Sequence, residues 1–160
     1  MNRALPFLGF VLWALISCSS KALYRADQNT PNGWGLDDTV SFQVDQPLGE
    51  SSNIYLHLRN NQDYPFSNIF LVVNVKAQDS IIESDTLEYA MAKPNGEWLG
   101  SGFSSVKESK LWWKEQWSTA AEPPYTVEIT QANRTNGREQ GEAILPGIVS
   151  VGLSITSAEN

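Results

Sequence analysis

The sequence predicts an all-β protein: a single β-sandwich of about 7–8 mostly antiparallel strands with a long Trp-rich connection. Apolar and polar residues alternate over several short segments, turn-forming residues separate these segments, and no long amphipathic helical pattern is present. This combination is typical of strands with one buried face in a sandwich or barrel. A sandwich is favoured because the strands are unevenly spaced and a long connection over 92–124 interrupts them.

Six segments carry the strand signal. Five of them alternate apolar with polar residues and predict half-buried strands, at 40–44, 54–58, 87–91, 125–129 and 149–155. The sixth, "NIFLVVNV" at 68–75, is apolar almost throughout and predicts a central strand covered on both faces. A turn is expected over 77–80, and one or two further strands are expected within 98–114.

The N-terminal residues have the composition of an export signal. Arg3 precedes an apolar run from Ala4 to Ile16, which is too short to span a bilayer and is typical of a signal peptide. The run ends in Leu-Ile-Ser-Cys, the pattern of the bacterial lipoprotein cleavage box, with the cysteine at position 18. The alternative is an ordinary secretory signal with an incidental cysteine.

Cys18 is the only cysteine, so the chain cannot form an internal disulfide. Because the cleavage box is that of a lipoprotein, we expect its sulfur to be diacylated. Two or three acyl chains hold a protein firmly, where one binds only marginally. The predicted organisation is a removed signal peptide over 1–17, a lipidated N-terminus and tether over 18–38, and a β-sandwich domain over 39–157. The membrane is therefore an expected partner, through the acyl chains on Cys18.

The composition argues against several classes of function. The net charge of −7 lacks the basic footprint of a nucleic-acid-binding protein and does not favour adsorption to anionic lipid. The apolar content of 41% indicates a folded core. One histidine and one acylated cysteine leave no zinc-binding set, and Asp37, Asp38 and Asp45 lack the spacing of a calcium loop. No metal and no cofactor are predicted.

No catalytic residue is predicted either. His57 lies on the polar face of its expected strand, but no serine sits in a nucleophile-elbow motif that would pair with it. Acidic residues over 83–115 could supply a glycosidase pair, yet such a pair is defined by separation in space. Carboxylates on outer strand faces also keep a sheet soluble. The sequence therefore favours a protein that is not an enzyme.

Four of the six tryptophans lie between residues 91 and 117. One interpretation is a platform that stacks sugar rings, with Trp113 and Trp117 as glycan or partner contacts. The other is a packed core and corner, since one tryptophan can dominate a small core. Trp112 and Trp113 are adjacent, so in a strand they point to opposite faces.

Four stretches of the chain are distinctive: "YPFSNIFLVVNV", "DTLEYAMAKPNGEWLGSGFSSVKESKLWW", "YTVEITQANR" and "LPGIVSVGLSI", which together span roughly residues 64–155. In this order they resemble the gliding motility-associated lipoprotein family called GldH. The resemblance implies a non-enzymatic, outer-membrane-associated lipoprotein needed for movement over surfaces. It also implies partners among envelope motility or secretion proteins that move adhesins. The domain could lie on either side of that membrane, in the periplasm or at the cell surface.

Two further expectations accompany the resemblance. The Trp-rich stretch is expected to form a corner in which Trp98, Leu99, Phe103 and Leu111 close one end of the sandwich, with a turn at 94–96. The alternative function is a glycan-binding lipoprotein of the cell surface with a β-sandwich carbohydrate-binding module.

One short pattern occurs three times: aspartate, then serine or threonine, then an aliphatic residue. It appears at 38–40, 79–81 and 85–87, and it resembles the acceptor motif for O-glycosylation of exported proteins in the bacterial group that includes gliders. The same pattern is also how a strand begins after a turn. We expect O-glycan at Thr39 or Ser80 before Thr86, because Thr39 and Ser80 lie at strand entrances.

Overall fold

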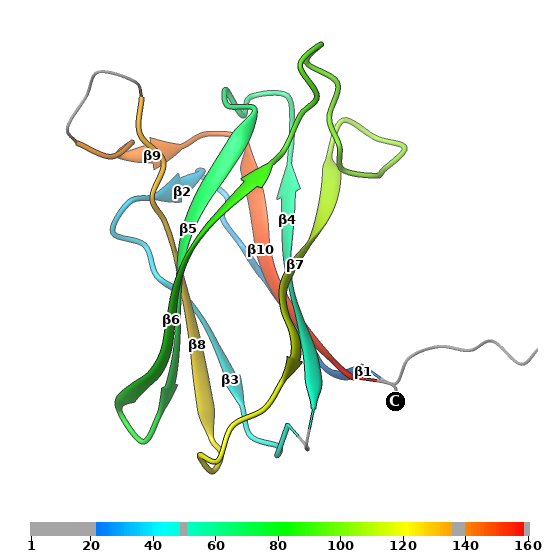
Figure 1. Cartoon of the computed structure of the whole chain (residues 1–160). Coiled ribbons are helices and arrows are strands. Elements are labelled where there is room, and N and C mark those ends of the chain that lie inside the picture. The colour runs from blue at the N-terminus through cyan, green and yellow to red at the C-terminus, as the bar shows by residue number, and fades with distance from the viewer. Residues whose placement is uncertain (1–21, 49–50, 136–139, 159–160) are drawn as a thin grey trace, which may run out of the picture.

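Two four-stranded antiparallel sheets face each other in the computed structural model, which describes residues 22–48, 51–135 and 140–158 (Figure 1). One sheet has the order β1 (Ala22–Asn29), β10 (Ile148–Ser157), β4 (Ser52–Asn60), β7 (Lys107–Trp117). The other has the order β3 (Val40–Val44), β8 (Tyr125–Gln131), β5 (Asn68–Ala77), β6 (Ser80–Ala90). A two-stranded ribbon joins β2 (Trp34–Gly35) to β9 (Ile144–Leu145). The predicted all-β sandwich is confirmed, and no helix occurs in these residues.

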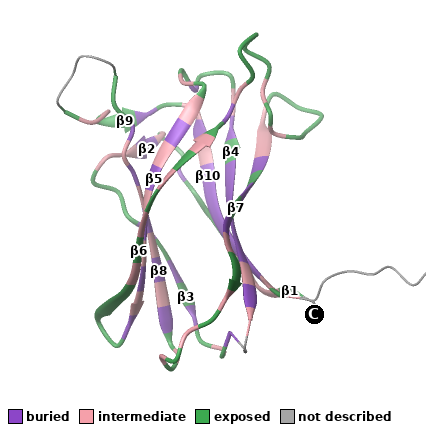
Figure 2. Cartoon of the chain, in the orientation of Figure 1, coloured by how far each residue is buried: buried purple, intermediate pink, exposed green. Residues whose placement is uncertain are grey.

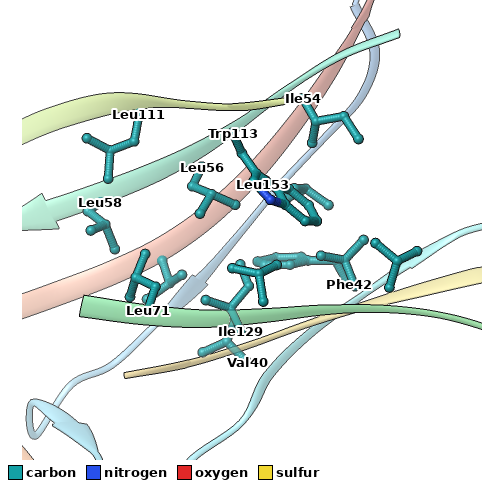
Figure 3. Close-up of a cluster of buried hydrophobic side chains, with 14 of the residues drawn as sticks. Val40, Phe42, Ile54, Leu56, Leu58, Leu71, Leu111, Trp113, Ile129 and Leu153 are labelled. Atoms are coloured by element: carbon teal, nitrogen blue, oxygen red, sulfur yellow. The ribbon is translucent and has the colours of Figure 1, made fainter. Parts of the chain in front are cut away.

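The core lies between the inner faces of the two sheets (Figures 2 and 3). Leu56, Leu58 and Leu153 reach it from the first sheet, and Leu71 and Ile129 reach it from the second. All five are fully buried. Burial alternates along β3 and β8, as the period-2 pattern predicts, because successive side chains in a strand point to opposite faces. Removal of this apolar surface from water is the main force that holds the sheets together.

The segment 68–75 is a central strand but is not covered on both faces. It forms β5, which lies between β8 and β6. Its residues alternate between buried and half-buried along the whole strand, with Phe70 and Val72 on the half-buried side. The prediction of double coverage is wrong because no second layer packs on the outer face of this sheet within the described residues. The expected turn at 77–80 is present, with Gln78 and Asp79 at positive φ.

The sandwich begins earlier than the sequence indicates. Ala22–Asn29 form β1, which pairs antiparallel with β10 over its length, for example at Arg25 and Ser154. Trp34 is fully buried, and its indole nitrogen donates to the Asp38 carbonyl oxygen at 2.8 Å. The prediction of a tether over 22–38 is therefore wrong. The sequence pattern does not predict this strand, because β1 is a largely exposed edge strand with few apolar residues.

The Trp-rich connection holds one of the eight long strands, β7, and only part of the expected corner. Trp98 packs against Tyr64 with ring centroids 6.2 Å apart, and Leu111 is buried in β7. Leu99 is 51% exposed and Phe103 is fully exposed, so the prediction that they close the end of the sandwich is wrong. The turn at 94–96 is confirmed, with Gly96 at φ 84° and its amide donating to the Lys93 carbonyl oxygen at 2.9 Å.

A seam of polar contacts joins β6 and β7, the edge strands of the two sheets. The indole nitrogen of Trp113 donates to Asp85 Oδ2 at 2.9 Å. The Lys114 ammonium contacts Asp85 at 2.7 Å and Glu83 at 3.0 Å. Trp117 Nε1 donates to Glu83 at 3.4 Å. These contacts lie over the edge of the core between β6 and β7, which would otherwise be exposed to water.

The seam also fixes the protonation states of its members. The hydrogen bond from Lys114 holds the pKa of Asp85 below its usual range, against the opposing effect of burial. Burial alone would lower the pKa of Lys114, but Asp85 and Glu83 outweigh it and raise that pKa. Further along β6, the Tyr89 hydroxyl donates to the Trp112 carbonyl oxygen at 2.7 Å. Burial raises the pKa of Tyr89 to about 12. The seam is therefore charged and hydrogen-bonded at neutral pH.

The adjacent tryptophans of β7 give a matched test of this arrangement. We predict that Trp113→Ala lowers the free energy of unfolding by about 3–5 kcal/mol, the usual cost of truncating a buried aromatic side chain. Trp112→Ala should cost only about 0.5–1.5 kcal/mol, the worth of an aromatic pair such as its edge contact with Tyr55. Urea unfolding followed by circular dichroism measures both. Equal losses for the two variants would contradict the seam.

Candidate functional site

The two tryptophans predicted as glycan or partner contacts, Trp113 and Trp117, both donate hydrogen bonds within the seam. Trp113 is 8% exposed and belongs to the core, so the prediction that it stacks on a ligand is wrong. Trp117 is half-buried and lies against Tyr125 with ring centroids 6.5 Å apart. Trp112 points the other way and is 46% exposed, which confirms that the adjacent tryptophans face opposite sides of the sheet. Trp112 is thus the exposed tryptophan of β7.

Trp112 belongs to an aromatic patch on the outer face of the first sheet. Its ring meets the Tyr55 ring edge-on, with centroids 4.7 Å apart and an interplanar angle of 85°. The Lys110 ammonium lies 3.7 Å from the centre of the Tyr55 ring, which is a cation–π distance. The pairing of β4 with β7 places Tyr55 beside Trp112 and His57 beside Lys110. This patch offers an aromatic surface and a positive charge to a partner.

A second group on the same face surrounds the only histidine; we call it the His57 cluster. His57 Nε2 lies 2.7 Å from Ser154 Oγ, and His57 Nδ1 lies 3.3 Å from Glu108 Oε1. Glu108 also accepts from Arg25 at 3.1 Å and from Arg59 Nε at 2.9 Å. Four strands therefore contribute, in the sheet order β1, β10, β4, β7, so the cluster crosses the whole first sheet.

A glycine in β10 provides the room for this cluster. Gly152 is the register partner of both Asp27 and His57. A Cβ at this position would lie 2.3 Å from Asp27 Oδ1 and 3.1 Å from the Ala26 carbonyl oxygen. Because the glycine has no side chain, its neighbours pack over β10, and Ser154 is buried on the outward face of the sheet. The sequence alternates over 149–155 as in a half-buried strand, but β10 is buried on both faces.

The chemistry of the partners decides the tautomer of His57. Burial lowers its pKa, and the Arg25 charge lowers it further, so the ring is neutral at neutral pH. A carboxylate only accepts hydrogen bonds, so Nδ1 carries the proton and donates to Glu108. Nε2 then accepts from the Ser154 hydroxyl. Burial alone would raise the pKa of Glu108, but the hydrogen bonds from Arg59 and Arg25 outweigh it and lower that pKa.

Serine, histidine and glutamate here follow the contact order of a hydrolytic triad. The setting does not suit acyl transfer. Ser154 is 6% exposed in the middle of β10, an interior strand paired on both sides with β1 and β4. A nucleophile must be able to reach its substrate, and the Ser154 hydroxyl is buried and bonded to His57. The cluster ties four strands together on the outer face of the first sheet.

Sequence reasoning missed the cluster because its members are far apart in the chain. His57 is 51 positions from Glu108 and 97 positions from Ser154. The one available signal was a lone histidine on the polar face of a strand. Among the described residues, no group of three or more His, Cys, Asp or Glu side chains is placed to hold a metal ion. Asp38 instead accepts from the Gly35 amide at 3.1 Å.

All three hydroxyls of the repeated Asp-Ser/Thr-aliphatic pattern lie at the surface. Thr39 is exposed directly before β3, and Ser80 is exposed at the start of β6, after the turn. Thr86 is exposed on the outward side of β6, beside a shallow hollow that Phe70, Ala132 and Arg134 also line. Their modification stays a prediction.

The predicted lipidation residue Cys18 and the predicted signal peptide over 1–17 lie outside the described residues. No helix in the part of the chain from residue 22 onward that the structure describes has the length and apolar character needed to cross a membrane.

The His57 cluster makes stability depend on pH in a defined window. An unfolded histidine takes up its proton near pH 6.5, whereas His57 in the folded state takes it up only at lower pH. The free energy of unfolding should therefore fall as pH falls below about 6.5. The half-buried carboxylates Asp85 and Glu108, with lowered pKa values, add their losses only below about pH 4.5.

We predict that His57→Gln removes the loss of stability between pH 6.5 and 5 and retains the loss at lower pH. His57 is the chain's only histidine, so no other imidazole titrates in this window. Urea unfolding at a series of pH values measures the effect. A wild-type stability that stays flat across the window, or an unchanged slope in the variant, would contradict the neutral buried imidazole.

Comparison with known proteins identifies the family of the chain. A family model described as GldH lipoprotein matches residues 22–155. The "Gliding motility lipoprotein GldH homolog" of Christiangramia forsetii is 42% identical over 154 residues, covering 94% of this chain and 93% of the relative. The "Gliding motility lipoprotein GldH" of Flavobacterium johnsoniae is 38% identical over 157 residues, covering 96% and 95%.

A solved structure, the VP2 subviral particle of infectious bursal disease virus, matches with a TM-score of 0.35 and 17% identity. It covers 96% of this chain and 37% of that one, and a likeness this low carries no argument. The family match spans the sandwich from the first residue of β1 almost to the end of β10. The resemblance seen in the sequence is confirmed, and the chain belongs to the GldH lipoprotein family.

Proposed function

We propose that this chain is an outer-membrane lipoprotein, acylated at Cys18, that acts as a non-enzymatic component of the gliding motility machinery. The observation that carries the proposal is the family match over residues 22–155, together with two relatives whose names give gliding motility. The family is not an enzyme family by name. A scaffold role linked to the secretion and movement of adhesins is the finer part of the proposal.

The geometry supports a binding role more than a chemical one. The Ser154–His57–Glu108 contacts are buried and structural, whereas the exposed groups of the first sheet are aromatic and cationic. Exposed aromatic and basic side chains on a rigid sheet suit contact with a protein partner, since Trp, Tyr and Arg are enriched at interface hot spots. Trp112 and Lys110 are accordingly the residues of this face that a partner in the envelope would meet.

The exposure of Trp112 also favours a second function, a glycan-binding surface. An indole on a sheet face can stack on a sugar ring, and Lys110 and Tyr55 lie beside it. Glycan-array binding of the purified domain separates the two functions. Binding that is lost in Trp112→Ala and kept in Trp34→Phe would favour the glycan surface, whereas absence of binding across the array leaves the motility role as the better account.

The lipid anchor gives the first test of the main proposal. We predict that Cys18→Ala abolishes palmitate labelling and membrane retention and removes the ability to restore gliding to a strain that lacks the gene. Ser19→Ala, one residue beyond, is the control and should behave as wild type. A Cys18→Ala protein that still sediments with the outer membrane and takes up labelled palmitate would contradict acylation at this residue.

A further inference from the structure

We infer that the end of the sandwich where β1 begins faces the membrane, and that Ile81 and Ile82 at the β5–β6 turn contact the lipid surface. The inference rests on the acylation of Cys18 in the proposed function and adds an orientation and a second membrane contact. The occupant to which it commits is the lipid surface that holds the acyl chains.

The chain between the anchor and the sandwich is short. Ala22 is the first residue of β1, and it follows Cys18 by only four positions. A fully extended chain spans at most about 3.3–3.6 Å per residue, so Ala22 lies within ~14 Å of the acylated cysteine. β1 cannot move away as a linker would, because it pairs with β10 from Ala22 to Asn29. Near its start, the Gln46 side chain donates to the Leu23 carbonyl oxygen at 2.5 Å.

The pairing pattern identifies which parts of the molecule share this end. In the first sheet, Ala22 pairs with Thr156 near the end of β10, and the end of β7 pairs with the start of β4. In the second sheet, Ala77 pairs with both Ser80 and Tyr125. The Trp117 and Tyr125 rings join the two sheets there. We call this the Ala22 end; it comprises Ala22, Ser157, the turn region 77–82 and the loop 118–124 (Figure 1).

The Ala22 end carries an apolar tip. Ile81 is 57% exposed and Ile82 is 37% exposed, directly after the turn that joins β5 to β6. These two neighbouring isoleucines at the start of β6 lose water contact when they enter a lipid surface, and the gain grows with the apolar area removed from water. A single exposed aliphatic residue needs no explanation, but this pair lies at the end that the short connection holds near the membrane.

The charges at this end shape the contact. Asp45, Asp79 and Glu122 are exposed there. Carboxylates are not attracted to an anionic lipid surface, so the contact is apolar rather than electrostatic. We therefore expect the isoleucine contact to be stronger on zwitterionic than on anionic vesicles. The connection 91–106, which holds the exposed Leu99 and Phe103, lies at the opposite end of the sandwich, away from the membrane (Figure 1).

The test uses full-length protein that its host has acylated, with a fluorophore attached at Ile82→Cys or, as the matched control, at Phe103→Cys. Each protein is reconstituted into phosphatidylcholine vesicles that contain a spin-labelled lipid quencher. Acylated Cys18 offers no free thiol, so each label has one site of attachment. We expect quenching at position 82 and none at position 103. Adding phosphatidylglycerol should reduce the quenching at 82.

A longer connection should weaken the contact without removing the anchor. Insertion of about ten Gly/Ser residues before Ala22 creates a flexible linker and should lower the quenching at position 82. Acylated protein that shows no quenching at 82, or more at 103 than at 82, overturns the inference and leaves the proposed function standing. An intact mass that lacks the acyl chains overturns both.

Discussion

The structure depends on the way in which β6 and β7 are held together at the open edge of the sandwich. The apolar core drives the two sheets into contact, but burial of apolar surface is non-directional and does not fix their alignment. Directional bonds fix the alignment of the two sheets. The Trp113 indole nitrogen and the Lys114 ammonium both contact Asp85, at 2.9 Å and 2.7 Å. Their donors come from one sheet and their acceptor from the other, so the bonds set how the sheets lie against each other.

The seam also explains the surface that the protein presents. Because alternate residues of β7 point inward, the strand that commits Trp113 to the core must turn Trp112 outward. Trp112 joins Tyr55 and Lys110 on the outer face, next to the His57 cluster. The glycine at position 152 lets that cluster lie flat over β10. One face of the molecule is thereby aromatic and charged, which is the property that the proposed binding role uses.

Much of the fold could be predicted from the sequence because its inner strands alternate strongly. Val40, Phe42 and Val44 mark β3 without ambiguity, and the same pattern marks β8 and β10. The edge strand β1 could not be predicted in this way, since its side chains are mostly exposed and only Leu23, Tyr24 and Ala26 pack against the core. Its stability comes from pairing with β10, a partner more than a hundred positions away in the chain.

The site was harder to predict than the fold. The seam joins residues 28 and 31 positions apart, and no local pattern states that an acidic residue of one strand will meet a tryptophan of another. Adjacent tryptophans showed that one must face outward, but not which one. Leu99 and Phe103 look like core residues by composition, yet they lie in a connection that no strand pairing draws into the core. Family resemblance supplied what local pattern could not, the expected cellular role.

A double-mutant cycle between Trp113 and Asp85 tests the central claim most directly. Trp113→Phe keeps the aromatic volume and removes the N–H donor, and Asp85→Ala removes the acceptor. If the seam holds the sheets together, the two losses in the free energy of unfolding are coupled by about 1 kcal/mol or more, as expected for a hydrogen bond to a charged group. Losses that add within about 0.5 kcal/mol would show that the indole and the carboxylate act independently, and would contradict the account.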